Sequence, residues 1–213
     1  MLVIQSLQEL EEFKKSRSDW RPWGFVPTMG ALHQGHLNLI EKAARDNALT
    51  WISIFINPTQ FNNPEDLQKY PQTLASDLEA IKKVAPKACV FVPSVDMMYP
   101  KGLKVQSFNF LGLDKTMEGL HRPGHFEGVA TVVQRLFKLT NPDRAYFGEK
   151  DFQQLKIVEL IGKKMQVDIR PCPIVREPNG LAMSSRNQRL TSDQKEKVPP
   201  LQPCMEFAHQ EPP

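Results

Sequence analysis

Two histidines three residues apart, His33 and His36, stand where an apolar run gives way to a helical pattern. In the first turn of a helix, residues at this spacing lie on the same face, so both imidazoles can reach one ligand. A glycine-containing turn from a strand into a helix directs free backbone N–H groups and the positive end of the helix dipole towards an anion. The stretch therefore predicts a phosphate site whose histidines donate hydrogen bonds and carry compensating charge near neutral pH, and hence nucleotide chemistry.

A metal site is the main alternative to this phosphate site. His121 and His125 form a second close pair, so four histidines can be imagined around one metal ion. The three cysteines are scattered and lack the Cys-x-x-Cys spacing of many zinc sites. A metal site would also leave the glycines beside the first histidine pair unexplained, so phosphate binding is the favoured interpretation.

Three further polar segments follow apolar runs and offer groups for the rest of such a site. They are residues 57–61, 146–154 and 179–187. In the first segment, Asn57 and Gln60 can fix a small polar ligand while Phe61 supplies an apolar wall. Taken alone, this segment is more typical of a plain loop with an Asn-Pro turn.

The two later segments carry charged groups. Lys150 offers a point charge to a polyphosphate, Asp151 can accept ribose hydroxyls or cap a helix, and Gln154 follows one turn on. In the last segment, two serine hydroxyls precede Arg186, whose guanidinium can bind an oxyanion in a bidentate manner. Each segment alone is also typical of a polar turn or a charged helix start.

Strand-like and helical patterns alternate along the chain, which predicts an α/β fold with helices on both faces of a parallel sheet. Strands are expected at 23–26, 50–56, 89–92, 145–147 and 167–175, and helices at 35–47, 74–84, 128–139 and 152–165. A capping box at Ser6 and Glu9 predicts a further short helix, and residues 104–111 a hairpin or an edge segment. Ligands bind such sheets at the carboxyl ends of the strands, where the polar segments fall, so these segments are predicted to form one site.

Composition narrows the classes of protein that fit. The chain has 213 residues and a net charge of +3, without a stripe dense in lysine and arginine, which argues against a nucleic-acid partner. The longest apolar runs fall short of the roughly 20 residues that a membrane helix needs. The N-terminus lacks the basic start and cleavage site of a signal peptide, and unpaired cysteines fit a reducing compartment. A cytoplasmic protein is therefore expected.

Six motifs occur in an order that resembles the pantothenate synthetases (pantoate–β-alanine ligases). They are PTMGALHQGH, NPTQF, YPQTLASDL, RPGHFEGV, FGEKDFQQL and GLAMSSRN, and the resemblance runs from near Met1 to about Thr191. The histidine turn alone is shared with other nucleotidyl transferases and with class I tRNA synthetases. The resemblance implies a cytoplasmic homodimer with a Rossmann-like, doubly wound sheet of the HIGH nucleotidyl-transferase type. It also implies ATP- and Mg²⁺-dependent joining of (R)-pantoate to β-alanine through a pantoyl-adenylate, with release of AMP and pyrophosphate.

The resemblance also implies roles for individual residues. His36 would be the proton donor, and His33, Lys150 and Arg186 would neutralise charge beside it. The residues expected to bind ATP are Met29, Gly30, His33, His36, Gly148, Glu149, Lys150, Asp151, Val175, Met183, Ser184, Ser185 and Arg186. Those expected to bind pantoate or β-alanine are Gln60, Gln154, Asn57, Met29 and Phe61. Asp77 resembles an acidic position near the Mg²⁺ ion, and Arg122 and His125 match a structural or site-bordering motif.

The last residues carry a separate expectation. Residues 1–190 are predicted to form the nucleotide- and pantoate-binding domain, and 191–213 a poorly ordered remnant of the smaller second domain found in the family, with a helix starting near Asp193. Since that domain helps to cover the site, ATP and pantoate are expected to dock while turnover is weak. Two other readings are an adenylyltransferase acting on another small acceptor and a non-catalytic nucleotide-binding homodimer. A zinc-structural role ranks below both.

Overall fold

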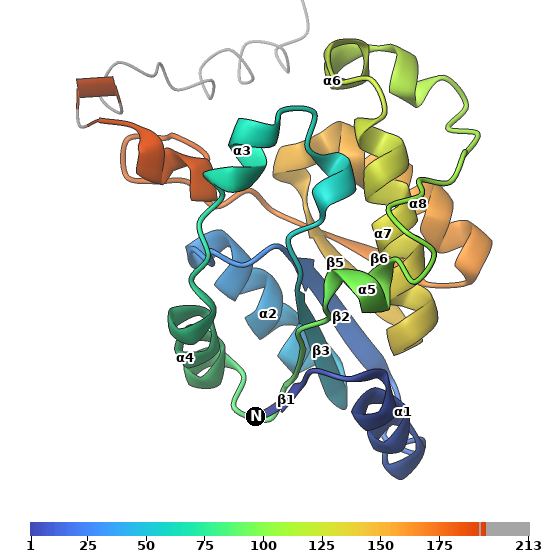
Figure 1. The fold of residues 1–213 in the computed structure, drawn as a ribbon. Coiled ribbons are helices and arrows are strands. Elements are labelled where there is room, and N and C mark those ends of the chain that lie inside the picture. Colours follow the sequence, from blue (N-terminus) through green and yellow to red (C-terminus); the bar gives the residue numbers. More distant parts are fainter. Residues whose placement is uncertain (192, 195–213) are drawn as a thin grey trace, which may run out of the picture.

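The strands form one parallel sheet at the centre of the molecule (Figure 1). A computed structural model describes residues 1–191, 193 and 194. Its strands are β1 (Leu2–Ile4), β2 (Trp23–Thr28), β3 (Leu49–Ile54), β4 (Cys89–Phe91), β5 (Arg144–Gly148) and β6 (Asp168–Cys172). Their order across the sheet is β1-β4-β3-β2-β5-β6. Every neighbouring pair runs parallel, as the alternation of strand and helix patterns predicts.

Helices cover both faces of this sheet. They are α1 (Leu7–Ser16), α2 (Gln34–Asp46), α3 (Pro64–Gln68), α4 (Leu74–Val84), α5 (Val95–Met98), α6 (Met117–His121), α7 (His125–Thr140) and α8 (Phe152–Met165). Short 3-10 turns lie at η1 (Pro58–Gln60), η2 (Leu113–Lys115), η3 (Glu149–Asp151) and η4 (Ser185–Arg189). Figure 1 shows α2 and α4 on one side of the sheet and α1, α7 and α8 on the other. Within the described ranges, no helix is long and apolar enough to cross a membrane.

Alternate residues of the central strands pack into the two layers. Phe25 and Trp51 lie in a core shared with α1, α7 and α8, whereas their neighbours Val26 and Ile52 pack with α2 and α4. All four side chains are fully buried. A strand covered on both faces reads as a continuous apolar run, and this is why the sequence of β3 lacks polar alternation.

The topological switch point of the sheet lies at β2. From β2 the chain proceeds to β3 and β4 on one side, then returns to place β5 and β6 on the other. Pairing of β2 with β3 continues to Thr28 opposite Ile54, whereas pairing of β2 with β5 joins Gly24 to Arg144 and Phe25 to Ala145. Ligands of doubly wound sheets bind beyond the strand ends at this point.

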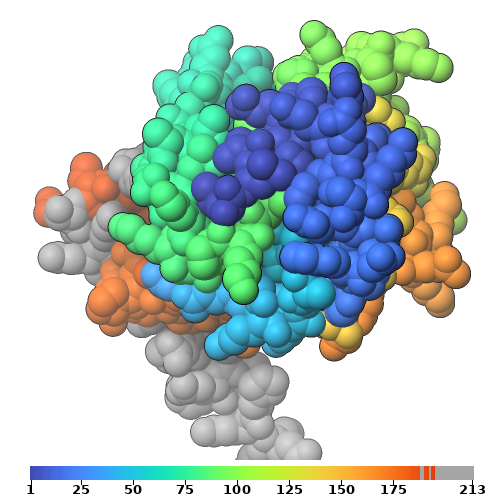
Figure 2. All heavy atoms as spheres, turned by 90° about the horizontal axis from the view of Figure 1, so that it is seen from below, coloured from blue at the N-terminus to red at the C-terminus, as the bar shows by residue number. Residues whose placement is uncertain are grey.

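Some elements differ from the sequence-based expectations. The first strand was not predicted; it pairs with β4, and Figure 2 shows the dark-blue N-terminal residues beside the green part of the chain. Residues 104–111 form neither a hairpin nor a strand, because Gln106 donates its N–H to Thr131 Oγ1 of α7 instead of pairing with a strand. Helix α7 begins at His125, three residues earlier than expected, after Gly124 turns the chain with φ 77°. The expected helix near Asp193 falls largely outside the described residues.

Candidate active site

A cavity of about 260 Å³ lies at the carboxyl ends of the strands and collects most of the predicted site residues. Those that line it are Met29, His33, His36, Asn57, Gln60, Phe61, Gly148, Lys150, Asp151, Gln154, Val175, Met183, Ser184, Ser185 and Arg186. Gly30 and Asp77 instead line a second cavity, of about 500 Å³, behind the histidine turn. Glu149 lines neither. The four segments predicted to form one site therefore do meet at one cavity.

The histidine turn is held together by its own side chains. His33 is the N-cap of α2, and its Nδ1 accepts the N–H of Gly35 at 3.1 Å. The Nδ1 of His36 accepts the N–H of His33 at 3.3 Å, and the two ring centroids lie 4.0 Å apart, on one face as predicted. Because each Nδ1 is an acceptor, each neutral ring carries its proton on Nε2. The turn therefore offers Nε2–H donors.

Burial keeps both rings neutral at physiological pH. It lowers the pKa of His36 from 6.5 to about 3, with further contributions from neighbouring His33 and Lys150. It lowers the pKa of His33 too, again with Lys150 adding to the effect. The expectation that these histidines carry compensating charge near neutral pH is therefore wrong for the structure as it stands, and they act as neutral hydrogen-bond donors. Charge must come from other residues.

Most backbone N–H groups of this turn bind partners within the protein, contrary to the expectation that they are free for an anion. The N–H of Gly30 donates to Thr28 Oγ1, and those of Ala31 and Leu32 donate to the Asp77 carboxylate. With the two N–H groups bound by histidine rings, most donors of the turn are already used inside the protein. Side chains rather than the backbone therefore present the donors for a phosphate.

A hydrogen-bonded loop after β3 fixes Gln60 at the cavity. Asn57 is 1% exposed, and its amide nitrogen donates to Gln60 Oε1 at 3.1 Å and to the Gly128 carbonyl at 3.2 Å. Its Oδ1 accepts the Tyr99 hydroxyl at 2.5 Å. The other end of the Gln60 amide donates to Met29 Sδ at 3.0 Å. Asn57 thus holds the loop and the side chain of Gln60, and its direct contact with a substrate stays a prediction.

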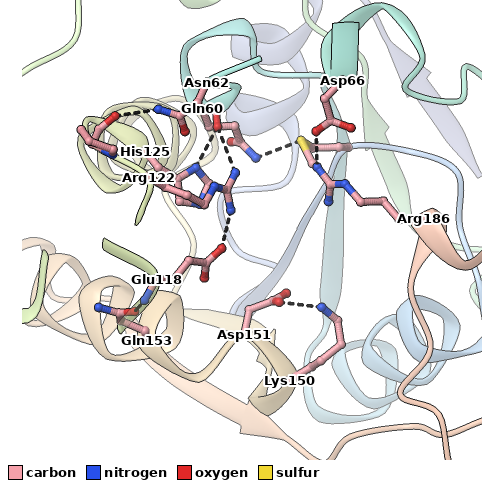
Figure 3. Close-up of polar contacts among 12 residues, drawn as sticks. Gln60, Asn62, Asp66, Glu118, Arg122, His125, Lys150, Asp151, Gln153 and Arg186 are labelled. Carbon is pink, nitrogen blue, oxygen red and sulfur yellow. Dashed lines mark hydrogen bonds and ion pairs between the residues drawn. The ribbon is translucent and has the colours of Figure 1, made fainter. Parts of the chain in front are cut away.

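The RPGHFEGV motif supports the same loop from α7. His125 is buried, and its Nδ1 lies 2.8 Å from the Gln60 carbonyl oxygen, to which Arg122 also donates at 3.4 Å (Figure 3). Arg122 is in addition paired with Glu118. A Cβ on Gly128 would lie 2.3 Å from the Thr59 carbonyl oxygen, so only glycine allows the helix to approach so closely. These contacts give the motif a structural role at the border of the cavity.

The segment after β5 brings a cation and an amide to the cavity. Lys150 Nζ lies 2.6 Å from Asp151 Oδ1, and Gln154 lines the cavity one turn further on. Asp151 occupies the N-cap position of α8, but its side chain makes no capping hydrogen bond and pairs with Lys150 instead. The adjacent Gln153 is buried and binds the 113–118 segment, with its Nε2 donating to the Thr116 carbonyl at 2.8 Å.

Arg186 is a further cation that lines the cavity, in addition to Lys150 and Arg122. Its guanidinium donates to Asp66 Oδ2 on α3 at 2.8 Å (Figure 3). It also lies 5.8 Å from the centre of the Tyr70 ring. The Ser185 hydroxyl is buried and donates to the Ala31 carbonyl at 3.0 Å, which ties this segment to the histidine turn. Segments more than a hundred residues apart in the sequence thereby share one wall.

Several lining residues were not predicted. Tyr70 and Glu118 come from segments between the polar motifs, and Val129, Val133 and Leu136 form an apolar wall from α7. The apolar positions of a helix give no sequence signal that separates a cavity wall from ordinary core, because both require the same residue types. Of these residues, Tyr70 begins the motif YPQTLASDL and Val129 ends RPGHFEGV, so these two could have been noticed in the sequence.

Metal binding by protein residues alone finds little support. Among residues 1–191, 193 and 194, no group of three or more His, Cys, Asp or Glu side chains is arranged to hold a metal ion. In particular, the four histidines do not form one centre. The alternative of a four-histidine metal site is therefore not supported by the geometry.

Comparisons with known proteins agree with this geometry. A family model described as pantoate-beta-alanine ligase matches residues 2–212. The chain belongs to this family. The pantothenate synthetase of Flavobacterium psychrophilum is 50% identical over 201 residues, which are 93% of this chain and 71% of that protein. That of Christiangramia forsetii is 48% identical over 199 residues, covering 92% of this chain and 68% of that protein.

Solved structures of family members share the fold closely. The pantoate-beta-alanine ligase of Francisella tularensis, crystallised with a β,γ-ATP compound and β-alanine, gives a TM-score of 0.87 at 39% identity, covering 99% of this chain and 80% of that one. The pantothenate synthetase of Thermus thermophilus gives a TM-score of 0.83 at 43% identity, covering 94% of this chain and 71% of that one. A tryptophanyl-tRNA synthetase from Campylobacter jejuni, 14% identical with a TM-score of 0.51, shares the fold alone. The predicted HIGH-type, Rossmann-like α/β architecture is thus confirmed.

Proposed function

We propose that this chain condenses (R)-pantoate with β-alanine at the expense of ATP, through a pantoyl-adenylate, with release of AMP and pyrophosphate. The observation that carries the proposal is the composition of one cavity, whose lining includes the neutral His33 and His36, the cations Lys150 and Arg186, and the amides of Gln60 and Gln154. A triphosphate needs hydrogen-bond donors and positive charge, and the hydroxyl groups of pantoate can bind amides, so the cavity can hold both side by side. Family membership supports the same assignment.

Each side of the cavity has its own task in the first half-reaction. Lys150 and Arg186 would bind phosphate oxygens, while the Nε2–H groups of His33 and His36 would donate to them without adding charge. Carboxylate attack on the α-phosphorus forms an O–P bond and breaks the bond to the β-phosphate. Negative charge then develops on the departing pyrophosphate, where preorganised donors and cations lower the barrier most.

The acid would lie between the two glutamines. Gln60 and Gln154 can donate to and accept from the pantoate hydroxyls, while the apolar wall of α7 suits its branched carbon chain. Asn57 and His125 hold the Gln60 loop and are proposed as positioning residues for this substrate. Correct alignment of an acid and a phosphorus contributes several kcal/mol to catalysis.

In the second half-reaction, the amine of β-alanine attacks the acyl carbon of the mixed anhydride. A C–N bond forms, the bond from the acyl carbon to the AMP oxygen breaks, and the amine loses a proton. Gln60, whose Nε2 donates to Met29 Sδ, is proposed to contact both substrates. The remaining proposals for this chain are a homodimeric state and a cytoplasmic location.

Mg²⁺ is expected to accompany ATP, as the sequence resemblance implies. This ion usually binds one or two carboxylates together with substrate phosphates and water. The expected ligand Asp77 fits poorly, because its oxygens already accept hydrogen bonds from Ala31, Leu32 and Thr73. No step of the proposed reaction is therefore assigned to the ion.

Isotope exchange tests the proposal directly. Labelled pyrophosphate should enter ATP only when pantoate is added, because adenylate formation is reversible. AMP release should in turn require both pantoate and β-alanine. Exchange without pantoate would point to an adenylyltransferase with another acceptor, and ATP binding without any exchange would leave a non-catalytic nucleotide-binding protein.

A further inference from the structure

Asp77 is a buried carboxylate that accepts two backbone N–H groups from one turn of the chain. The residue lies in α4 and is 3% exposed. Its Oδ1 accepts the N–H of Leu32 at 2.8 Å, and its Oδ2 accepts the N–H of Ala31 at 3.0 Å and the Thr73 hydroxyl at 3.1 Å. Among the described residues it forms no ion pair. A buried charge without a cation needs such hydrogen bonds, so the turn and the carboxylate stabilise each other.

The turn that Asp77 binds has an unusual backbone path. Gly30 has φ 79° and Ala31 has φ 51°, so two successive residues are left-handed. Glycine adopts this conformation freely, whereas alanine does so at a cost of about 1–2 kcal/mol. The two charge-assisted hydrogen bonds that the Asp77 carboxylate accepts from this turn offset that cost. A Cβ on Gly30 would also lie 3.1 Å from Asp77 Oδ2, which shows how closely the two segments pack.

The path of this turn decides where the histidines lie. Leu32 is followed directly by His33, whose ring caps α2 and whose N–H binds His36. The Ala31 carbonyl also accepts the Ser185 hydroxyl, which places the segment that carries Arg186. A shift of the Ala31–Leu32 peptide would therefore move both the two histidines and the segment that carries Arg186.

We propose that Asp77 is a positioning residue that holds the histidine turn in register with the nucleotide, rather than a ligand of the Mg²⁺ ion. The inference rests on the proposed function, since it gives the turn its phosphate-binding task. It assigns to Asp77 a role behind the cavity wall, in keeping with its place at the second cavity and its absence from the lining of the first.

The variant Asp77→Asn separates the two roles. Asparagine keeps the shape but has one acceptor oxygen, so one of the two turn N–H groups loses its partner and faces an NH₂ donor. Loss of a buried charged hydrogen bond should raise the KM for ATP by about tenfold or more and lower the melting temperature without nucleotide by several degrees. The Mg²⁺ concentration that gives half-maximal pyrophosphate exchange should stay unchanged.

Opposite results overturn the inference. A metal ligand predicts that Asp77→Asn raises the Mg²⁺ requirement, that high Mg²⁺ restores exchange, and that the melting temperature without nucleotide is unchanged. The control Ile81→Val removes a buried methyl group from the same helix. An Asp77→Asn variant whose KM for ATP matches that of this control would show a purely structural role.

A milder variant keeps the inference testable if Asp77→Asn does not fold. Thr73→Val removes the hydroxyl that donates to Oδ2, the same oxygen that accepts the Ala31 N–H. We expect a smaller rise in the KM for ATP, about threefold, with the KM for pantoate unchanged. An unchanged KM for ATP in this variant contradicts the inference. Pantoate-dependent exchange by the unmodified protein tests the proposed function separately, so the two can fail independently.

Discussion

Acid should destabilise this protein through His36, and the size of the effect follows from its surroundings. Burial lowers the pKa of His36 from 6.5 to about 3 in the folded protein. The unfolded chain therefore binds a proton in a pH range where the folded protein does not, and stability present above about pH 6.5 is lost as the pH falls towards 3. The full difference between the two pKa values corresponds to about 5 kcal/mol of unfolding free energy. About 2 kcal/mol of this unfolding free energy should be lost between about pH 7.5 and about pH 5.

The variant His36→Asn isolates this contribution. Asparagine Oδ1 can replace Nδ1 as acceptor for the His33 N–H, but it does not titrate. Urea unfolding at the two pH values should show a loss of stability that is about 2 kcal/mol smaller in the variant than in the unmodified protein. His121→Asn, which removes an exposed histidine outside the cavity, serves as the matched control and should keep the full loss. If His36→Asn and His121→Asn lose stability equally, then His36 is not held neutral by its burial and the reasoning is wrong.

The remaining predictions concern the charged and amide groups of the cavity. Lys150→Ala should raise the free energy of the transition state for pyrophosphate exchange by about 3 kcal/mol, which slows the exchange more than about a hundredfold. The melting temperature should barely change, because the ion pair of Lys150 with Asp151 is exposed. Equal exchange rates in the variant and the unmodified protein would show that Lys150 does not bind phosphate. Gln60→Ala should raise the KM values for pantoate and β-alanine far more than the KM for ATP, as initial-rate kinetics can show. A larger rise in the KM for ATP would contradict the assignment of Gln60 to the pantoate site. Asp66→Asn should release Arg186 from its ion pair and tighten ATP binding severalfold, as calorimetry at low salt can measure, and this gain in affinity should shrink as salt is added. Weaker ATP binding would instead mean that Asp66 holds Arg186 in place for the nucleotide.

Much of the architecture could be predicted because strands and helices leave clear periodic patterns. The continuous apolar run of β3 indicates a strand buried on both faces, and Phe25 and Val26 do face opposite layers. The three residues of β1 are too few to show a pattern, and only their pairing with β4 defines them as a strand. Residues 104–111 alternate weakly, yet their backbone binds a threonine of α7. Tertiary partners, not local sequence, decide such segments.

The membership of the site was more predictable than its electrostatics. Polar motifs that follow strand ends meet at one edge of a parallel sheet, so their convergence follows from topology. The state of each group depends on neighbours that a sequence does not reveal. His36 loses its expected charge through burial, and Asp77 is turned inward by the Ala31 and Leu32 N–H groups. Side-chain contacts between distant segments, which motifs do not reveal, therefore decide the charge and orientation of these groups.

The charge balance of the cavity follows from these contacts. Because the histidines are neutral, Lys150 and Arg186 are the cations proposed to bind the phosphates. Lys150 is paired with Asp151, and Arg186 is paired with Asp66. Exposed ion pairs of this kind contribute only about 0–1 kcal/mol, so a triphosphate can replace either carboxylate at little cost. The pairs still restrain the two side chains near the positions where phosphate oxygens would bind. Specific binding would thus arise from exchange of partners around fixed cations, with the neutral Nε2–H groups of the histidine turn setting the geometry.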